Sequence, residues 1–163
     1  MEARLGRLED IEAIGNLKHR YAYYIDHGYD ADGLAGLFVE DAVWESNVAG
    51  TYRGRAEIRR FIDGLRGKIP WALHFFLNPV IEVAPDGQRA TGRWYLLELC
   101  TMPGVEDRAV HDSVVVTGSY EDTFVKQDGE WRFKRVKAHF HQISNLDQGW
   151  VRQRYRPTEL VKP

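Results

Sequence analysis

The sequence has one cysteine, Cys100, and no apolar run near the roughly 20 residues that a membrane-crossing helix needs. Its N-terminal stretch, MEARLGRLED, is charged and lacks the apolar segment of a secretory signal. The net charge is −2 at pH 7, so nothing favours nucleic acid or an anionic membrane surface as a partner. We therefore expect a soluble, cytoplasmic protein without an intramolecular disulfide or a multi-cysteine metal site.

The sequence also lacks the short motifs that mark many cofactor-dependent and covalent enzymes. It contains no phosphate-binding loop, no G-x-S-x-G nucleophile elbow and no dinucleotide fingerprint. Aromatic residues, in contrast, make up 12% of the 163 residues, with five Trp, eight Tyr and seven Phe. Such rings fill a core or line a pocket for a flat apolar ligand, and a chain of this length is expected to form one domain.

Helical spacing of apolar residues predicts three helices in the first part of the chain. The first runs from about residue 4 to Asp26 and has one apolar face. A short second helix is predicted to carry Leu34, Leu37 and Phe38 and to end at residues 40–41, before a first strand in AVWES. A third helix follows a glycine turn, and its predicted inward positions are Ile58, Phe61, Ile62 and Leu65.

From residue 71 onward the pattern changes to long strands separated by turns such as PDGQ and QDGE. The four strands read WALHFFLNPVIEV, RATGRWYLLELCT, AVHDSVVVTGSYEDTFVK and EWRFKRVKAHFHQIS. Gly118 lies inside the third strand and predicts a bulge or bend. Helices followed by an antiparallel meander predict an α+β fold, in which N-terminal helices pack against a strongly curved, mostly antiparallel sheet with an apolar interior.

A histidine and an aspartate are the first candidates for chemistry. His74 shares one strand face with Phe76 and Asn78, and both faces of this strand are largely apolar. Asp26 ends the first helix, where the helix dipole disfavours a carboxylate. Two interpretations are open: a core histidine with a solvated helix end, or a pair in which Asp26 binds Nδ1 of His74 and leaves Nε2 free to abstract a proton.

Glu98 and two tyrosines are candidates for a general acid. Glu98 follows Trp94 and Leu96 on one face of its strand. It points either into an apolar interior, which favours its protonated form, or out into water at the strand end. Tyr21 and Tyr24 either donate a phenolic proton to a substrate oxygen or pack as aromatic residues on the helix.

Three histidines on neighbouring strands, His111, His139 and His141, match the number of protein ligands that a catalytic zinc commonly takes. H-x-H on a strand is a weak signal, however, and surface or hydrogen-bonding histidines are the more common outcome. We therefore predict no metal site. His111 and His139 are kept as candidates for contacts with a substrate.

Several segments together resemble the SnoaL-like branch of the NTF2-like superfamily, whose fold is a cone-shaped α+β barrel. They are DIEAIGNLKHRYAYYID, ALHFFLNPVIEV, ATGRWYLLE and QDGEWRF, and they span about residues 8–140. The sequence resembles the bile acid 7α-dehydratases and, more distantly, scytalone dehydratase and hexachlorocyclohexane dehydrochlorinase. The resemblance implies a domain of residues 1–145 followed by a C-terminal tail, residues 146–163.

The resemblance also implies roles for individual residues. Asp26 and His74 match the family's catalytic dyad, and Tyr21 matches the tyrosine of the steroid dehydratases. Glu98 falls where those enzymes have an aspartate that acts as a catalytic acid. Phe140 lies about where the family has an arginine that would pair with a carboxylate or thioester-linked group. This departure puts the bile-acid thioester substrate in doubt.

We predict a cofactor-independent lyase, a dehydratase that eliminates water from a hydroxylated steroid-like or other polycyclic ketone. His74, oriented by Asp26, removes a proton α or vinylogous to the carbonyl, while Tyr21 or Glu98 protonates the departing hydroxyl. The candidates for contact with the apolar substrate are Tyr24, Trp44, Trp71, Phe76 and Trp94.

Other functions remain open for the same residues. The dyad also serves an isomerase, a polyketide cyclase or a dehydrohalogenase, and a non-catalytic module that binds a small molecule is the alternative from another class. Contact between His74 and Asp26 inside a cavity favours an enzyme, whereas a filled cone favours a structural role. The resemblance further implies a homotrimer, in which the tail, with Trp150 and Tyr155, packs on another part of the protein and covers a neighbouring pocket.

Overall fold

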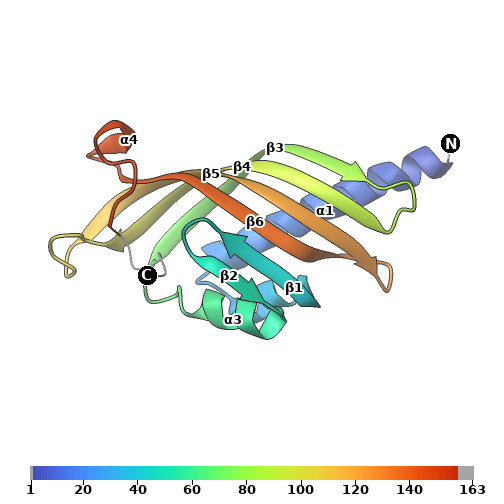
Figure 1. Cartoon of the computed structure of the whole chain (residues 1–163), viewed down its shortest axis with the longest axis horizontal. Helices are drawn as coiled ribbons and strands as arrows, with labels where there is room; N and C mark the ends of the chain where they lie inside the picture. The colour runs from blue at the N-terminus through green and yellow to red at the C-terminus, as the bar shows by residue number, and fades with distance from the viewer. Residues whose placement is uncertain (1, 158–163) are drawn as a thin grey trace.

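The computed structural model describes residues 2–157 (Figure 1). Its helices are α1 (Glu2–Asp26), α2 (Ala31–Ala35), α3 (Arg55–Asp63) and α4 (Gly149–Arg152). Its strands are β1 (Phe38–Ser46), β2 (Gly50–Arg53), β3 (Trp71–Val83), β4 (Arg89–Pro103), β5 (His111–Gln127) and β6 (Glu130–Asn145). Among the described residues, no helix is long and apolar enough to cross a membrane.

The strands form one sheet in the order β2-β1-β6-β5-β4-β3. Neighbouring strands are antiparallel except β1 and β6, which run parallel. The sheet arches over α1 and α3, which lie on the same side of it (Figure 1). The predicted α+β fold, with N-terminal helices packed on a curved and mostly antiparallel sheet, is therefore confirmed.

The apolar face of α1 is buried beneath this sheet. Ile14, Leu17, Tyr21 and Ile25 are each at most 5% exposed. These positions recur every three or four residues, so they lie on one side of the helix. Their burial fixes which side of α1 faces the sheet and, with it, where the end of the helix points.

The predicted extent of the second helix is wrong. α2 ends at Ala35, and the residues from Phe38 onward form β1 instead of continuing the helix to residues 40–41. Phe38 pairs with Phe133 of β6, the centroids of the two rings are 5.1 Å apart, and both side chains are fully buried. Burial of these rings through a non-local strand pairing outweighs the local helical spacing.

The predicted bulge at Gly118 is confirmed. The register of β5 against β6 shifts between Thr117 and Gly118. A Cβ atom at Gly118 would lie 2.7 Å from the backbone oxygen of His139. A side chain does not fit this close approach of two strands, which explains the glycine.

The face of the sheet turned away from the helices carries large apolar side chains. On β3 and β4 they alternate with inward residues, as strand geometry requires. The exposed members of this outer face include Trp71, Leu73, Phe75, Leu77, Tyr95 and Leu99. Trp71, a predicted pocket residue, is half exposed here, because it shares the outer face with its alternate neighbours on β3.

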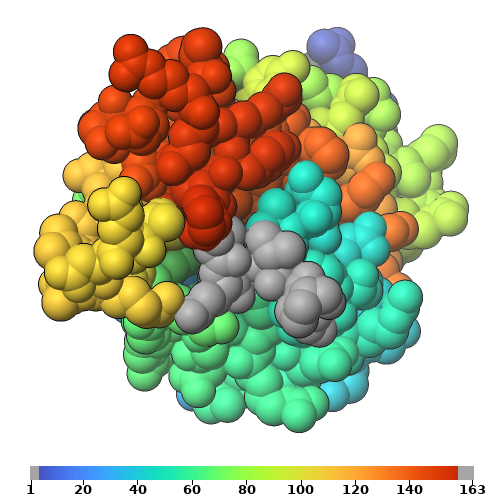
Figure 2. Space-filling view, turned by 60° about the vertical axis from the view of Figure 1, so that its left-hand side comes forward, coloured from blue at the N-terminus to red at the C-terminus, as the bar shows by residue number. Residues whose placement is uncertain are grey.

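The C-terminal tail packs along the end of β6. Tyr155 forms an isolated parallel bridge with this strand, and Arg156 donates through Nη2 to the carbonyl oxygen of Pro103 at 2.8 Å. Figure 2 shows the red tail segment beside the yellow loop that follows β4. Trp150 is 60% exposed in the single chain, and the prediction that the tail covers a neighbouring pocket stays a prediction. Residues 158–163 of the predicted tail lie outside the described residues.

Candidate active site

The end of α1 brings a carboxylate against β3. Asp26 is the last residue of α1, and Gly28, in the left-handed conformation with φ of +82°, turns the chain away after it. Oδ1 of Asp26 lies 2.7 Å from Nδ1 of His74. The backbone N–H of His74 donates to both carboxylate oxygens, at 3.1 and 3.2 Å. Asp26 thereby fixes both the backbone and the ring of His74, which is the contact that the paired interpretation of the sequence predicts.

A second carboxylate faces the other ring nitrogen of His74. Glu98 is the direct antiparallel partner of His74 in the β3–β4 pair, and Oε2 of Glu98 lies 3.4 Å from Nε2. Glu98 is 5% exposed, so it takes the inward one of its two predicted orientations. With Nδ1–H committed to Asp26, a neutral His74 carries its lone pair on Nε2.

The electrostatics of this cluster favour a proton on His74. Burial by itself would lower the pKa of His74, but the charge of Glu98 and the hydrogen bond and charge of Asp26 outweigh it. The pKa of His74 is therefore raised above its ordinary value. When the ring is protonated, each of its N–H groups has a carboxylate beside it. The site is thus able to hold an abstracted proton.

Tyr21 supplies a hydroxyl to the same region. The indole Nε1–H of Trp44 donates to the hydroxyl oxygen of Tyr21 at 2.8 Å. An indole N–H is a donor only, so the proton of Tyr21 is not used in this bond. Burial raises the pKa of Tyr21 well above its ordinary value, although the hydrogen bond from Trp44 opposes the shift. The phenol therefore keeps its proton at neutral pH.

These side chains border a cavity between the helices and the sheet. It offers about 70 Å³ to the centres of water molecules, each of which needs about 10–15 Å³, so several waters fit. The polar lining comes from Tyr21, Tyr29, His74, Glu98 and Tyr120. The apolar lining includes Trp44, Phe61, Met102, Val116, Phe140 and Ile143. No lysine or arginine of the described part of the chain borders this cavity.

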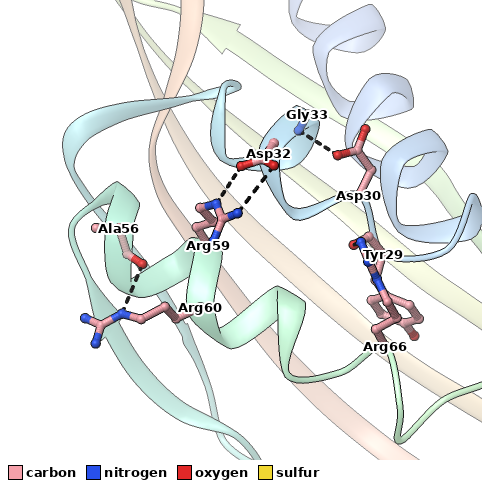
Figure 3. A network of polar contacts seen from close by, with 8 residues as sticks. All are labelled: Tyr29, Asp30, Asp32, Gly33, Ala56, Arg59, Arg60 and Arg66. Carbon is pink, nitrogen blue, oxygen red and sulfur yellow. Dashed lines mark hydrogen bonds and ion pairs between the residues drawn. The ribbon is translucent and has the colours of Figure 1, made fainter.

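Tyr29 is a cavity residue that the sequence analysis did not single out. Its φ of +56° is in the left-handed region, where a non-glycine residue is strained. Arg66 holds this turn by donating to the carbonyl oxygen of Gly28 at 3.1 Å and to that of Tyr29 at 3.2 Å. Figure 3 shows Arg66 beside Tyr29. An ion pair of 2.5 Å between Asp32 and Arg59 joins α2 to α3 close by. These contacts attach the turn to the region of α3 and keep the ring of Tyr29 at the cavity. No local sequence pattern predicts this position of Tyr29.

Three residues predicted to contact a substrate lie away from the cavity. Phe76 and Trp94 point inward but surround the side chain of Lys18, with ring centroids 4.1 and 5.1 Å from its Nζ. The ring of Tyr24 lies against Gly33 of α2, where an added Cβ atom would be 2.5 Å away. Strand and helix periodicity indicates the buried face of an element, but it does not indicate how far along the core a residue lies.

The rings of His139 and His141 lie 5.6 Å apart, but His111 does not join them. His111 is exposed at the start of β5, where it pairs with Pro103, whereas His139 is exposed on β6 opposite Ser119. The length of β5 between these pairs separates the two, and neither borders the cavity. The prediction that they contribute to one substrate pocket therefore does not hold for this cavity. Within residues 2–157, no three His, Cys, Asp or Glu residues are grouped so as to hold a metal ion.

Lys18 is a buried charge that sequence reasoning missed. It is fully buried, and its Nζ lies 2.7 Å from Oδ2 of Asp122 on β5. Burial lowers the pKa of Lys18 and raises the pKa of Asp122, while their mutual attraction opposes both shifts. The sequence does contain a pattern that indicates this burial. Lys18 lies four residues after Ile14 and three before Tyr21, which places it on the apolar face of α1.

Comparison with known proteins gives a consistent grouping. The family model of the SnoaL-like domain matches residues 6–137. A candidate scytalone dehydratase from Novosphingobium aromaticivorans is 25% identical, with a TM-score of 0.75 over 86% of this chain and 89% of its own. A hexachlorocyclohexane dehydrochlorinase from Novosphingobium barchaimii is 22% identical, with a TM-score of 0.76 over 88% and 94%. An NTF2-like protein with a cystatin-like fold from Novosphingobium aromaticivorans is 29% identical, with a TM-score of 0.66 over 93% and 91%.

Proposed function

This chain belongs to the SnoaL-like family and has the NTF2-like fold, and we propose that it is a cofactor-independent lyase that eliminates water from a hydroxylated steroid-like or other polycyclic ketone. The observation that carries the proposal is His74, whose ring lies between Asp26 and Glu98 at the wall of a largely apolar cavity. The likeness to a candidate scytalone dehydratase supports the same class of reaction.

The proposed reaction begins with removal of a carbon-bound proton. Nε2 of His74 takes a proton from the carbon α or vinylogous to the carbonyl, while Asp26 stabilises the imidazolium through Nδ1–H. The electron pair of the broken C–H bond forms the new double bond, and the C–O bond to the hydroxyl breaks. Tyr21 donates its proton to the departing hydroxyl, which leaves as water.

The proton balance closes within the site. His74 has gained one proton and Tyr21 has lost one, so return of a proton from the imidazolium to the phenolate restores both residues. Glu98, 3.4 Å from Nε2, is the group placed to take the proton from His74 first. A protonated Glu98 is the alternative acid for the departing hydroxyl. No electrons leave or enter the substrate, so this step needs no redox partner.

The lining of the cavity favours an uncharged substrate. Phe140 borders it on β6, and none of the described residues at this cavity is a lysine or arginine. A carboxylate or phosphate placed here would be buried without a counter-ion and close to Asp26 and Glu98, which is costly. A neutral ketone has no such cost.

Size restricts how a polycyclic substrate enters. Pockets for drug-sized ligands measure about 300–1,000 Å³, whereas this cavity offers about 70 Å³ to water centres. The ring with the reacting bond therefore sits beside His74 in our proposal. The remaining rings extend past Phe61 of α3, whose displacement widens the cavity.

The deciding experiment is ultraviolet-monitored turnover of hydroxylated 3-keto steroids and single-ring β-hydroxy ketones. We expect new conjugated-enone absorbance with the wild type and its loss in His74→Ala and Asp26→Asn. His139→Ala, which changes an exposed histidine on β6, is the matched control and should keep wild-type turnover. Absorbance that survives His74→Ala would assign the base to another residue. A folded wild type that turns over nothing would favour a binding module.

We also propose that the chain forms a homotrimer through the outer face of β3 and β4. Leu73, Phe75 and Leu77 leave an apolar strip exposed there, of a kind that often marks an interaction surface. Sedimentation velocity should give a trimer for the wild type and monomers for Phe75→Lys. Val151→Lys, at an exposed tail position, is the control and should stay trimeric. A monomeric wild type would refute the proposal, and a dimer would refute the stoichiometry.

A further inference from the structure

The ion pair between Lys18 and Asp122 has a cost that folding alone does not require. Both side chains are fully buried, and the distance from Nζ to Oδ2 is 2.7 Å. Two charges removed from water lose their hydration, and well-packed apolar residues often stabilise a fold as well as such a pair does. An apolar pair at these positions would continue the apolar face of α1. The presence of charge here therefore needs an explanation other than burial.

Aromatic rings enclose the ammonium group of Lys18. Its Nζ lies 3.9 Å from the ring centroid of Tyr120 and 4.8 Å from that of Tyr21. The rings of Phe76 and Trp94 approach it from β3 and β4. A cation attracts the faces of such rings, and the attraction is strongest where water is excluded. The ammonium thus holds two tyrosine rings at once.

Each of the two charged residues lies two or three positions from one of the two tyrosines in the sequence. Lys18 lies one helical turn before Tyr21 on α1, and Asp122 lies two residues after Tyr120, on the same inward face of β5. The pair therefore joins α1 to β5 beside the edge contact of the two tyrosine rings, whose centroids are 6.5 Å apart. Apolar contacts between a helix and a sheet are non-directional, whereas an ion pair has one partner at one distance.

We propose that Lys18 and Asp122 are positioning residues for the acid of the elimination: the ammonium of Lys18, held by Asp122, contacts the rings of Tyr21 and Tyr120 and so fixes the phenol of Tyr21 at the cavity. This inference rests on the proposed function, because it assigns a task to the acid of that reaction. Neither Lys18 nor Asp122 borders the cavity or touches the substrate. Trp44, which donates to the same phenol oxygen, completes the support of Tyr21.

The test replaces the ion pair with an apolar pair, Lys18→Met together with Asp122→Leu, and compares two leaving groups on one carbon skeleton. Departure of hydroxide requires an acid, whereas chloride leaves without one. We expect kcat for the β-hydroxy ketone to fall by about 10²-fold, the lower end of a general acid's contribution. KM for both substrates and kcat for the β-chloro ketone should stay near their wild-type values.

The matched control applies the same two substitutions to an exposed ion pair. Lys134→Met with Asp41→Leu removes a surface pair of 2.5 Å between β6 and β1 and should change neither rate. Equal losses of kcat on both leaving groups in the buried variant would show general damage and overturn the proposal. Unchanged kcat for the β-hydroxy ketone would overturn it as well.

A second readout does not depend on turnover. The protein is labelled with ¹³C at tyrosine Cζ. The resonance of Tyr21 is the one that is absent from the ¹³C spectrum of Tyr21→Phe. The buried apolar pair should shift or broaden this resonance, and the surface control should not. An unchanged resonance overturns the positioning role. If the wild type turns over neither substrate, the proposed function fails by itself, and this spectrum still decides whether the ion pair fixes Tyr21.

Discussion

Two clusters of buried charge join α1 to the sheet, and they differ in what lies beside them. Asp26, at the end of α1, holds His74 of β3, and the imidazole borders a cavity. Lys18, about two turns earlier, holds Asp122 of β5, and aromatic rings enclose its ammonium group instead. Both clusters are buried and both contain a shifted pKa, that of His74 upward and that of Lys18 downward.

Burial and a shifted pKa therefore do not identify a catalytic group by themselves. A base needs open space beside the atom that takes the proton. His74 borders the cavity, whereas Lys18 is enclosed by aromatic rings. We therefore assign chemistry to the first cluster and support to the second.

The largest expected effect is a loss of stability when the ion pair between Lys18 and Asp122 is broken. Lys18→Met leaves Asp122 buried without a counter-ion, so the free energy of unfolding should fall by about 3–5 kcal/mol. Adding Asp122→Leu removes the unpaired charge and should restore most of this loss. Urea unfolding of both variants measures the difference. A Lys18→Met protein as stable as the wild type would mean that this cluster is not a tightly coupled ion pair.

Substitutions in the cluster of Asp26 and His74 should change the activity more than the stability. Asp26→Asn keeps the size of the side chain but removes the charge that stabilises the imidazolium. We expect kcat for elimination to fall by about 10²-fold, equivalent to about 2.7 kcal/mol. Asp41→Asn, at an exposed position on β1, is the control. Wild-type kcat in Asp26→Asn, measured with the enone assay, would separate His74 from its proposed orienter.

A smaller effect is expected from pH, with opposite signs for activity and stability. The base must be neutral, so kcat/KM should rise with pH through the pKa of His74, which lies above 6.5. The raised folded-state pKa contributes stability that is fully present below the unfolded pKa and is lost as pH rises through the folded one. The His74→Gln variant should not show this loss of stability as the pH rises. Measurements of kcat/KM and of urea unfolding at a series of pH values across the neutral range test the two expectations. If activity and stability both rose, or both fell, with pH, the assignment of His74 as the base would be contradicted.

Local periodicity accounts for the parts of the fold that the sequence predicted correctly. Steps of three and four residues placed Tyr21 on the apolar face of α1, and alternation placed His74 on the same face of β3 as Phe76. The glycine at position 118 marked a real bulge. The same reasoning extended α2 too far, because Phe38 pairs with Phe133 of β6, and local spacing contains no information about that pairing.

Periodicity along the chain indicates which residue types are available to the site and which of them share a face. Which of these residues meet depends on how the helices and strands pack together. The register of β3 against β4 places Glu98 opposite His74, and the packing of α1 on β5 brings Lys18 to Asp122. A periodic pattern reports the buried side of one element, because it depends on neighbours along the chain. The partner on the other element depends on how all the elements pack together, and no single segment contains that information.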